Sequence, residues 1–171
     1  MKQTTRLTRL FVLLTALFLG ACTQRYQSPV AAEVKSQALN ASFGGLDGQV
    51  VQLAQFRGRV TVLLFFATYD LSSQIAARRL DDFYHAHQPK VNALGVALEA
   101  PRNVELVRAF GEFIEMDYPL VMMSRQGSDI FSKEIYSVPA WVILKPDGSI
   151  AASLTGAPSL ELLEKTVRQA H

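Results

Sequence analysis

Two kinds of apolar pattern alternate along the chain after residue 41. Some segments are continuously apolar over strand length, such as VTVLLFF at 60–66, which is typical of a central strand covered on both faces. Others repeat apolar residues at helical spacing, as Ala76, Leu80 and Phe83 do. The pattern predicts strands at 59–66, 91–98, 119–123 and 140–144. It predicts helices at 71–87, 103–115 and 128–135, and a final helix with Leu160, Leu163 and Val167 facing inward and Pro158 in its first turn.

Two turn signals complete this pattern. Asp47-Gly48 stands between Phe43 and the pair Val50-Val51, which predicts an N-terminal β-hairpin. Pro146-Asp147-Gly148 predicts a second hairpin that leads into a strand at 149–154. Strands that alternate with helices and end in a hairpin indicate an α/β fold, a three-layer sandwich with a mixed central sheet and helices on both faces.

The first residues have the pattern of a targeting segment. Lys2, Arg6 and Arg9 precede an apolar run at 10–19, followed by Gly20 and Ala21, which predicts a secretory signal peptide over 1–21. The polar, weakly periodic stretch that follows predicts a tether over 22–40 and a folded domain over 41–171.

Cys22 ends the stretch LGAC at 19–22, which resembles the lipobox of bacterial lipoproteins. The resemblance implies that Cys22 carries lipid and becomes the mature N-terminus, so that acyl chains anchor the protein to a membrane. The alternative is that Cys22 is a small residue beside an ordinary cleavage site. Thr23, in place of an aspartate after the cysteine, favours the outer membrane where a cell has two.

Removal of the signal changes the charge balance. The whole chain has 17 basic and 15 acidic residues, and the mature chain would keep 14 basic and all 15 acidic ones, a net charge of about −1. Nothing here indicates a nucleic-acid partner. Cys22 is also the chain's single cysteine, so the folded domain has no disulfide and no thiol catalyst.

Two segments together resemble the TlpA-like thioredoxin proteins. The run FRGRVTVLLFFATYD at 56–70 is similar to the family's strand that ends in F-W-A-T-W-C-x-x-C, and YSVPAWVIL at 136–144, with Asp147-Gly148 and Gly156 beyond it, is similar to V-P-T-T-F-L-I-D-x-x-G. The resemblance covers about residue 42 to the C-terminus. It implies a thioredoxin fold with an added N-terminal hairpin, in a family of envelope thiol-disulfide oxidoreductases.

By position, Asp70 stands in place of the family's first cysteine and Ser73 in place of the second. We interpret Asp70 as a helix N-cap, whose carboxylate accepts from backbone N–H groups and suits the helix dipole. The alternative, a general base or metal ligand, lacks partners nearby in the sequence. Ser72 or Ser73 as a nucleophile needs a positioned base. His85 lies about 18 Å farther along the helix axis, and a metal site at His85 and His87 is disfavoured because residues two apart do not share a helix face.

Val138-Pro139 is the second place where the sequence resembles the family's active-site region. In the resembled family this proline is cis, and the backbone beside it pairs with an extended substrate chain. The resemblance implies a peptide groove formed by Tyr69, Asp70, Leu71, Val138, Pro139 and Ala140; the alternative is that Pro139 is kept for turn geometry alone. Glu99 lies near the place where some relatives have an acidic residue that tunes the thiols.

Two functions follow as hypotheses. The first is a lipid-anchored, redox-inactive protein of the bacterial envelope, facing the periplasm or another extracytoplasmic space, that binds a protein or extended peptide without cofactor or metal. The second is a TlpA-like oxidoreductase in envelope redox homeostasis or cytochrome maturation that works with a partner's thiols.

Overall fold

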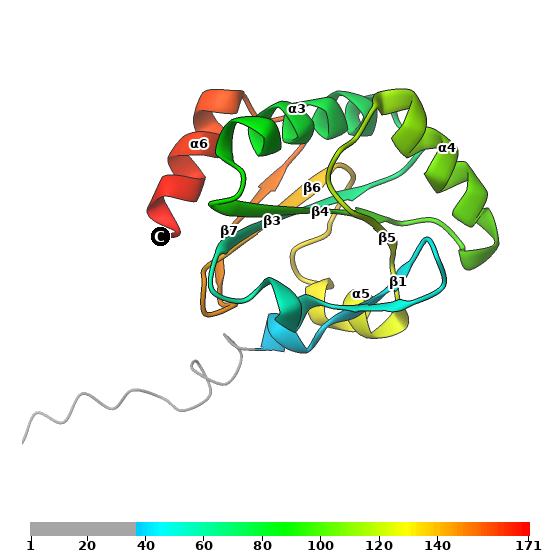
Figure 1. Cartoon of the computed structure of the whole chain (residues 1–171), viewed down its shortest axis with the longest axis horizontal. Helices are drawn as coiled ribbons and strands as arrows, with labels where there is room; N and C mark the ends of the chain where they lie inside the picture. The colour runs from blue at the N-terminus through cyan, green and yellow to red at the C-terminus, as the bar shows by residue number, and fades with distance from the viewer. Residues whose placement is uncertain (1–36) are drawn as a thin grey trace, which may run out of the picture.

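A computed structural model of the chain describes residues 37–171 (Figure 1). Its strands form one seven-stranded sheet in the order β2-β1-β5-β4-β3-β6-β7. The strands are β1 Ser42–Gly45, β2 Val50–Gln52, β3 Val60–Phe66, β4 Val91–Ala97, β5 Leu120–Met122, β6 Ala140–Leu144 and β7 Ile150–Thr155. The helices are α3 Leu71–His87, α4 Val104–Ile114, α5 Arg125–Phe131 and α6 Leu160–Gln169, with short 3₁₀ turns η1 Gln37–Asn40, η2 Leu53–Phe56 and η3 Pro101–Asn103.

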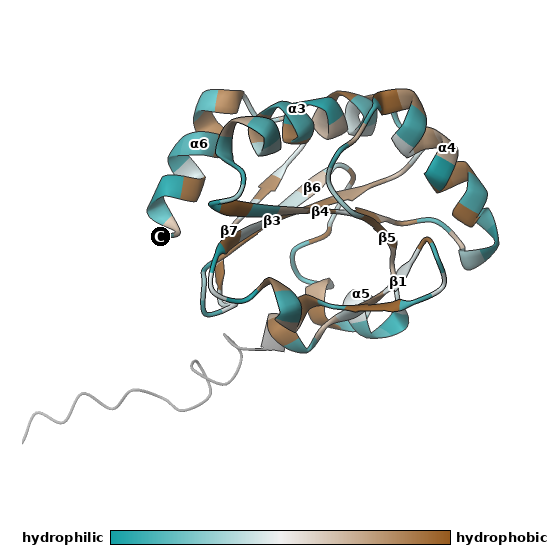
Figure 2. Cartoon of the chain, in the orientation of Figure 1, coloured by the Kyte–Doolittle hydropathy of each residue, from teal (hydrophilic) through white to brown (hydrophobic). Residues whose placement is uncertain are grey.

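Helices cover both faces of the sheet, which confirms the α/β three-layer architecture. Figure 1 shows α3, α4 and α6 above the sheet, and α5 below it. The upper layer packs through Leu80, Val107 and Leu163, among others, and the lower layer includes Phe131 and Leu53. Figure 2, coloured by hydropathy, shows several brown strands through the middle of the molecule and helices in which teal and brown residues alternate. The fold is thioredoxin-like, with a mixed sheet.

Strand β3 organises this core because all seven of its residues are buried. It pairs parallel with β4 and antiparallel with β6, and the second pairing sets Phe65 opposite Ala140. Alternate side chains therefore enter the two layers, with Val62 and Leu64 on the α3 side and Leu63 and Phe65 on the α5 side. The predicted central strand is confirmed.

Both predicted hairpins are present. The first joins β1 to β2, with Gly48 at a φ of 82° and the Asp47 carboxylate accepting from the amide of Gln49. The second joins β6 to β7, where Gly148 also has a φ of 82°. Positive φ values of this size favour glycine, and Asp-Gly is the sequence signal that supplies them.

Two predicted helix starts are wrong by a few residues. Helix α5 begins at Arg125, before the predicted 128, because the Ser124 hydroxyl accepts from the amide of Gly127 and caps the helix there. Pro158 precedes helix α6 and does not lie in its first turn, since Ser159 is the N-cap. Leu160, predicted to face inward, is 39% exposed because it is the first residue after that cap.

The folded domain starts earlier than predicted. Residues 37–40, assigned from sequence to the tether, form η1, and both Ala38 and Leu39 are buried. Leu39 packs over Gly148, where a Cβ would come within 2.0 Å of the leucine Cγ. The missing side chain of Gly148 thus makes room for the start of the domain. The signal peptide, Cys22 and the rest of the tether lie outside the described residues.

Across residues 37–171, no helix combines the length and the apolar character needed to cross a bilayer.

Candidate functional site

Asp70 begins helix α3 directly after the loop that follows β3. Its backbone is extended, with φ −96° and ψ 122°, and its carboxylate Oδ2 accepts from the amide of Ser73 at 2.6 Å. The carboxylate therefore satisfies one of the free N–H groups at the helix start and lies at the positive end of the helix dipole. This geometry is the N-cap expected from the sequence.

Ser73 lies in the core at the base of the same turn and has no exposed surface. Its hydroxyl oxygen accepts from the amide of Ala67 at 3.3 Å and so ties the loop after β3 to helix α3. Because this hydroxyl is buried and bonded to the Ala67 amide, a substrate in solvent cannot reach it. The geometry agrees with the sequence argument against a serine nucleophile.

The two histidines of α3, His85 and His87, have partners elsewhere on the molecule. His87 places Nδ1 2.8 Å from the carbonyl of Phe83 and stacks on that ring at 4.2 Å. His85 lies between two carboxylates, with Nε2 3.0 Å from Asp117 and 3.3 Å from Asp81. Neither histidine is placed as a base beside the Ser73 hydroxyl.

Glu99 supports the site loop from the end of β4. Its Oε1 accepts from both the amide and the hydroxyl of Thr68, at 3.0 and 2.7 Å, and Oε2 accepts from the side-chain amide of Asn103 at 3.3 Å. Burial raises the pKa of Glu99, but the bonds from Thr68 and Asn103 outweigh it, so the pKa lies below its usual value. Sequence reasoning gave this residue no role without thiols. The structure makes it the anchor of the loop.

The Val138–Pro139 segment lies beside the same loop. Phe65 pairs with Ala140, so the chain just before β6 runs next to the chain just after β3. The Val138–Pro139 peptide is cis, as in the resembled family, and the Pro139 carbonyl accepts from the amide of Gly156 at 2.8 Å. Ala140, proposed from sequence as part of the groove lip, is fully buried because the sheet pleat directs its side chain into the core. It is not available to a bound peptide.

Four large side chains on or next to the two segments are exposed, one before Val138 and three at the loop after β3 and the start of α3. Tyr136 is 83% exposed, Tyr69 82%, Leu71 69% and Ile75 47%. We call these four residues the apolar rim. Tyr69 and Leu71 were predicted, whereas Tyr136 and Ile75 were not. Ile75 could have been found from its spacing, because it lies one helical turn after Leu71.

Comparison with known proteins supports the thioredoxin-like fold. No family model matches the chain. The thiol-disulfide oxidoreductase ResA of Bacillus thuringiensis subsp. konkukian is 22% identical over 137 residues, which cover 80% of this chain and 78% of that protein. A thiol:disulfide interchange protein of the thioredoxin family from Chlorobium tepidum matches with a TM-score of 0.69 at 17% identity, over 78% of this chain and 94% of that chain. A secreted disulfide oxidoreductase of Mycobacterium tuberculosis, described as homologous to E. coli DsbE, matches with a TM-score of 0.65 at 21% identity, over 77% of this chain and 97% of that chain.

The chain has a thioredoxin-like fold, and its sequence is similar to a thiol-disulfide oxidoreductase of the ResA type. Asp70 and Ser73 stand where the sequence resemblance places the two cysteines of the C-x-x-C motif, and the single cysteine, Cys22, precedes the described residues. The site therefore keeps the loop, the helix start and the proline segment of its relatives, with a carboxylate cap and a buried hydroxyl in the places of the thiols.

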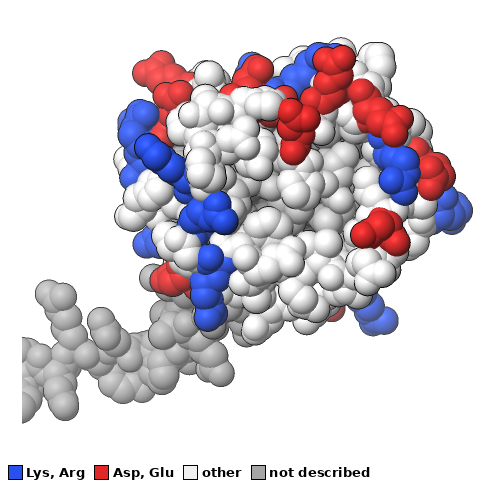
Figure 3. All heavy atoms as spheres, viewed as in Figure 1, with Lys and Arg blue, Asp and Glu red and all other residues white. Residues whose placement is uncertain are grey.

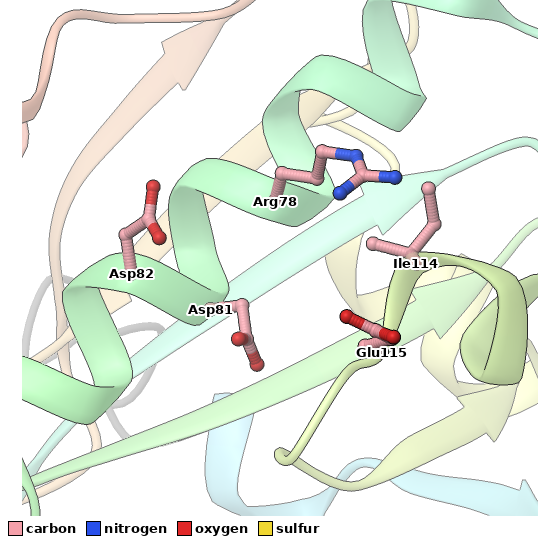
Figure 4. Close-up of a pocket in the computed structure, with 5 residues that line it drawn as sticks. All are labelled: Arg78, Asp81, Asp82, Ile114 and Glu115. Carbon is pink, nitrogen blue, oxygen red and sulfur yellow. The ribbon is translucent and has the colours of Figure 1, made fainter.

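A polar recess of about 290 Å³ lies on another part of the domain (Figure 4). Arg78, Asp81 and Asp82 of α3 line it together with Ile114 and Glu115 at the end of α4. Arg78, the lining residue nearest to Asp70 along α3, is about 12 Å from it at 1.5 Å per residue, so the recess is separate from the site. Among residues 37–171, no three His, Cys, Asp or Glu side chains are grouped so as to hold a metal ion.

Proposed function

We propose that this protein is a lipid-anchored, redox-inactive member of the TlpA-like proteins that binds an extended polypeptide at the apolar rim, on the extracytoplasmic side of a bacterial membrane. The observation that carries the proposal is the exposure of the rim beside the Val138–Pro139 segment. The four large exposed side chains belong to segments that flank the adjacent strands β3 and β6, and a patch of exposed apolar surface is typical of an interaction site.

The groups available at the rim favour a peptide over a small molecule. Tyr69 and Tyr136 offer large apolar faces with a hydroxyl at the tip, a combination enriched at protein interfaces. Val138 is half-buried and follows Tyr136 by two residues, so its backbone can lie alongside an extended chain while the rim contacts side chains.

The chemistry at the helix start supports binding without redox turnover. Thiol-disulfide exchange needs an attacking thiolate and a resolving thiol. Asp70 and Ser73 supply neither, and both side chains are committed to internal hydrogen bonds. The carboxylate preserves a negative charge at the helix start, which keeps the loop in place for binding.

The proposed location rests on the N-terminal sequence. The charged start, the apolar run, the small residues and Cys22 occur in the order of a lipoprotein signal. One structural relative is described as secreted, which supports the extracytoplasmic placement.

A peptide-binding measurement with matched variants tests the proposal. Full-length protein in detergent is exposed to an array of short, cysteine-free peptides from envelope proteins, alongside Leu71→Asp/Tyr136→Asp and, as control, Phe113→Asp. Phe113 is 70% exposed on α4 and lies outside the rim, so its variant adds one negative charge to a different apolar surface. We expect binding to fall at least tenfold in the rim variant and to persist in the control. Equal binding by all three proteins would contradict a groove at the rim.

The same preparation discriminates the oxidoreductase hypothesis. If the protein worked through a partner's thiols, binding would be confined to peptides that contain cysteine. Binding of cysteine-free peptides at the rim, with no such preference, is the result that the proposal predicts.

A further inference from the structure

Strand β7 forms one edge of the sheet, and among residues 37–171 no strand lies beyond it. Its segment 149–156 reads SIAASLTG and contains no charged residue and no proline. Natural edge strands usually carry lysine, proline or other devices that prevent pairing with another chain. The opposite edge, β2, has only three residues. The edge of β7 is therefore the longer surface open to strand addition.

The register of β7 identifies the backbone groups that point outward. The amide of Gly156 donates to the Pro139 carbonyl just before β6. Leu154 and Ala152, two and four residues before Gly156, are paired with β6 in the same register. In an antiparallel ladder only alternate residues bond to a given neighbour. The N–H and C=O groups of Ser153 and Thr155 therefore face away from β6. Ala151 has no partner in the ladder, because the register shifts between Ile143 and Leu144.

We infer that β7 pairs antiparallel with β7 of a second copy of this chain, about a two-fold axis at Leu154. In that register Ser153 faces Thr155 of the second copy and Thr155 faces Ser153, which forms about four backbone hydrogen bonds. The two Leu154 side chains, each half-buried in one copy, meet directly across the axis. Because β7 has no charged side chain, the symmetric pairing sets no like charges opposite each other.

The charges on helix α6 favour a second copy of this chain, and not a strand of another protein, as the partner of β7. Its inner residues Leu163 and Val167 belong to the same apolar cluster as Leu154, so α6 covers the face of the sheet to which Leu154 points. Its acidic residues are Glu161 and Glu164 in the first half, and its basic residues are Lys165 and Arg168 in the second. Figure 3 shows acidic side chains at the upper left and basic ones below them, on the side where Figure 1 places α6.

A two-fold axis at Leu154 places both α6 helices on the same face of the joined sheet, running in opposite directions. The acidic half of each helix is then nearer the basic half of the other, and exposed charges arranged in this way attract more strongly at low salt. A foreign peptide has no reason to carry this matching distribution. The inference does not rest on the proposed peptide groove.

The test is the association of full-length protein in detergent, measured by sedimentation at several concentrations and salt levels. Ser153→Pro removes an outward N–H and leaves the bonds to β6 intact, since proline is accepted on edge strands whose N–H faces solvent. We expect wild type and the control Ser153→Thr to dimerise, and Ser153→Pro to weaken the dimer at least tenfold with unchanged Trp141 fluorescence. A monomeric wild type, or a dimer that Ser153→Pro does not weaken, would overturn the inference.

Cross-linking checks the register without depending on the proline variant. In a Cys22→Ser background, Ser153→Cys/Thr155→Cys sets two cysteines of each chain opposite two of the other, and mild oxidation should give a disulfide-linked dimer. The control Asp129→Cys/Lys133→Cys places exposed thiols on and after α5, away from β7, and should stay monomeric. Cross-linking of the β7 pair to a different protein, or equal dimer yield from the α5 pair, would refute the self-pairing.

Discussion

Replacement of Asp70 by alanine isolates the role of the carboxylate that stands where a thiol is expected. The variant removes the acceptor of the Ser73 amide, a bond of 2.6 Å at the start of a 17-residue helix. Loss of an N-cap costs about 0.5–2 kcal/mol. The upper half of that range applies here because Ser73 is buried and its amide is poorly placed to find water. We therefore expect the free energy of unfolding to fall by about 1.5 kcal/mol.

Urea and thermal unfolding measure this change directly, because the chain has a single tryptophan, Trp141, which is buried in β6. For a domain of this size, a loss of 1.5 kcal/mol lowers Tm by about 6 °C. Asp70→Asn keeps an acceptor oxygen and loses only the charge, so its cost should be about 0.5 kcal/mol.

Ser159→Ala provides a matched control, since it removes the exposed cap of α6, a longer bond of 3.2 Å to the Leu162 amide. It should cost about 0.5–1 kcal/mol. An Asp70→Ala protein as stable as wild type, or one less affected than Ser159→Ala, would refute the assignment of Asp70 as the cap that holds this loop.

The remaining predictions concern the thiols, the loop anchor and the core. Asp70→Cys/Ser73→Cys should form an intramolecular disulfide, seen as loss of titratable thiol on oxidation, because the helix start that lowers a thiol pKa is still present. The pKa of Glu99 lies below the ordinary value of 4.5, so its contribution to stability is present above that pH and is lost as the pH falls through the lower value. Glu99→Gln should therefore flatten the pH dependence of urea unfolding in this acidic range. Gly95→Ala would bring a Cβ within 2.5 Å of Leu120, so thermal unfolding should show a destabilisation of about 1–3 kcal/mol.

Local patterns predicted most of the fold because each depends on neighbours in sequence. The continuous apolar run of β3 and the cap residue before Leu71 are each visible within a few neighbouring residues of the sequence. The ends of strand β3 and helix α3 lie within a residue of their predicted positions. Leu39 and Gly148 show the limit of this reasoning, because their contact joins residues far apart in the chain. No local rule marks residues 37–40 as part of the domain.

The candidate site was only partly predictable for the same reason. Asp70 follows from helix capping, which is local. The anchoring of Thr68 by Glu99 requires β3 and β4 to be adjacent and in register. Ala140 was misplaced because resemblance gives a position along the chain but not the direction in which the sheet pleat turns its side chain.

Photo-cross-linking on the native membrane tests most directly whether the retained site binds a polypeptide. A photoreactive phenylalanine analogue is placed at Tyr136 in the rim and, as control, at Phe113 on α4; both side chains are well exposed. We expect a discrete adduct from position 136 that survives reducing agent and disappears with Leu71→Asp, and no such adduct from position 113. No adduct from position 136, or the same adduct from both positions, would contradict it.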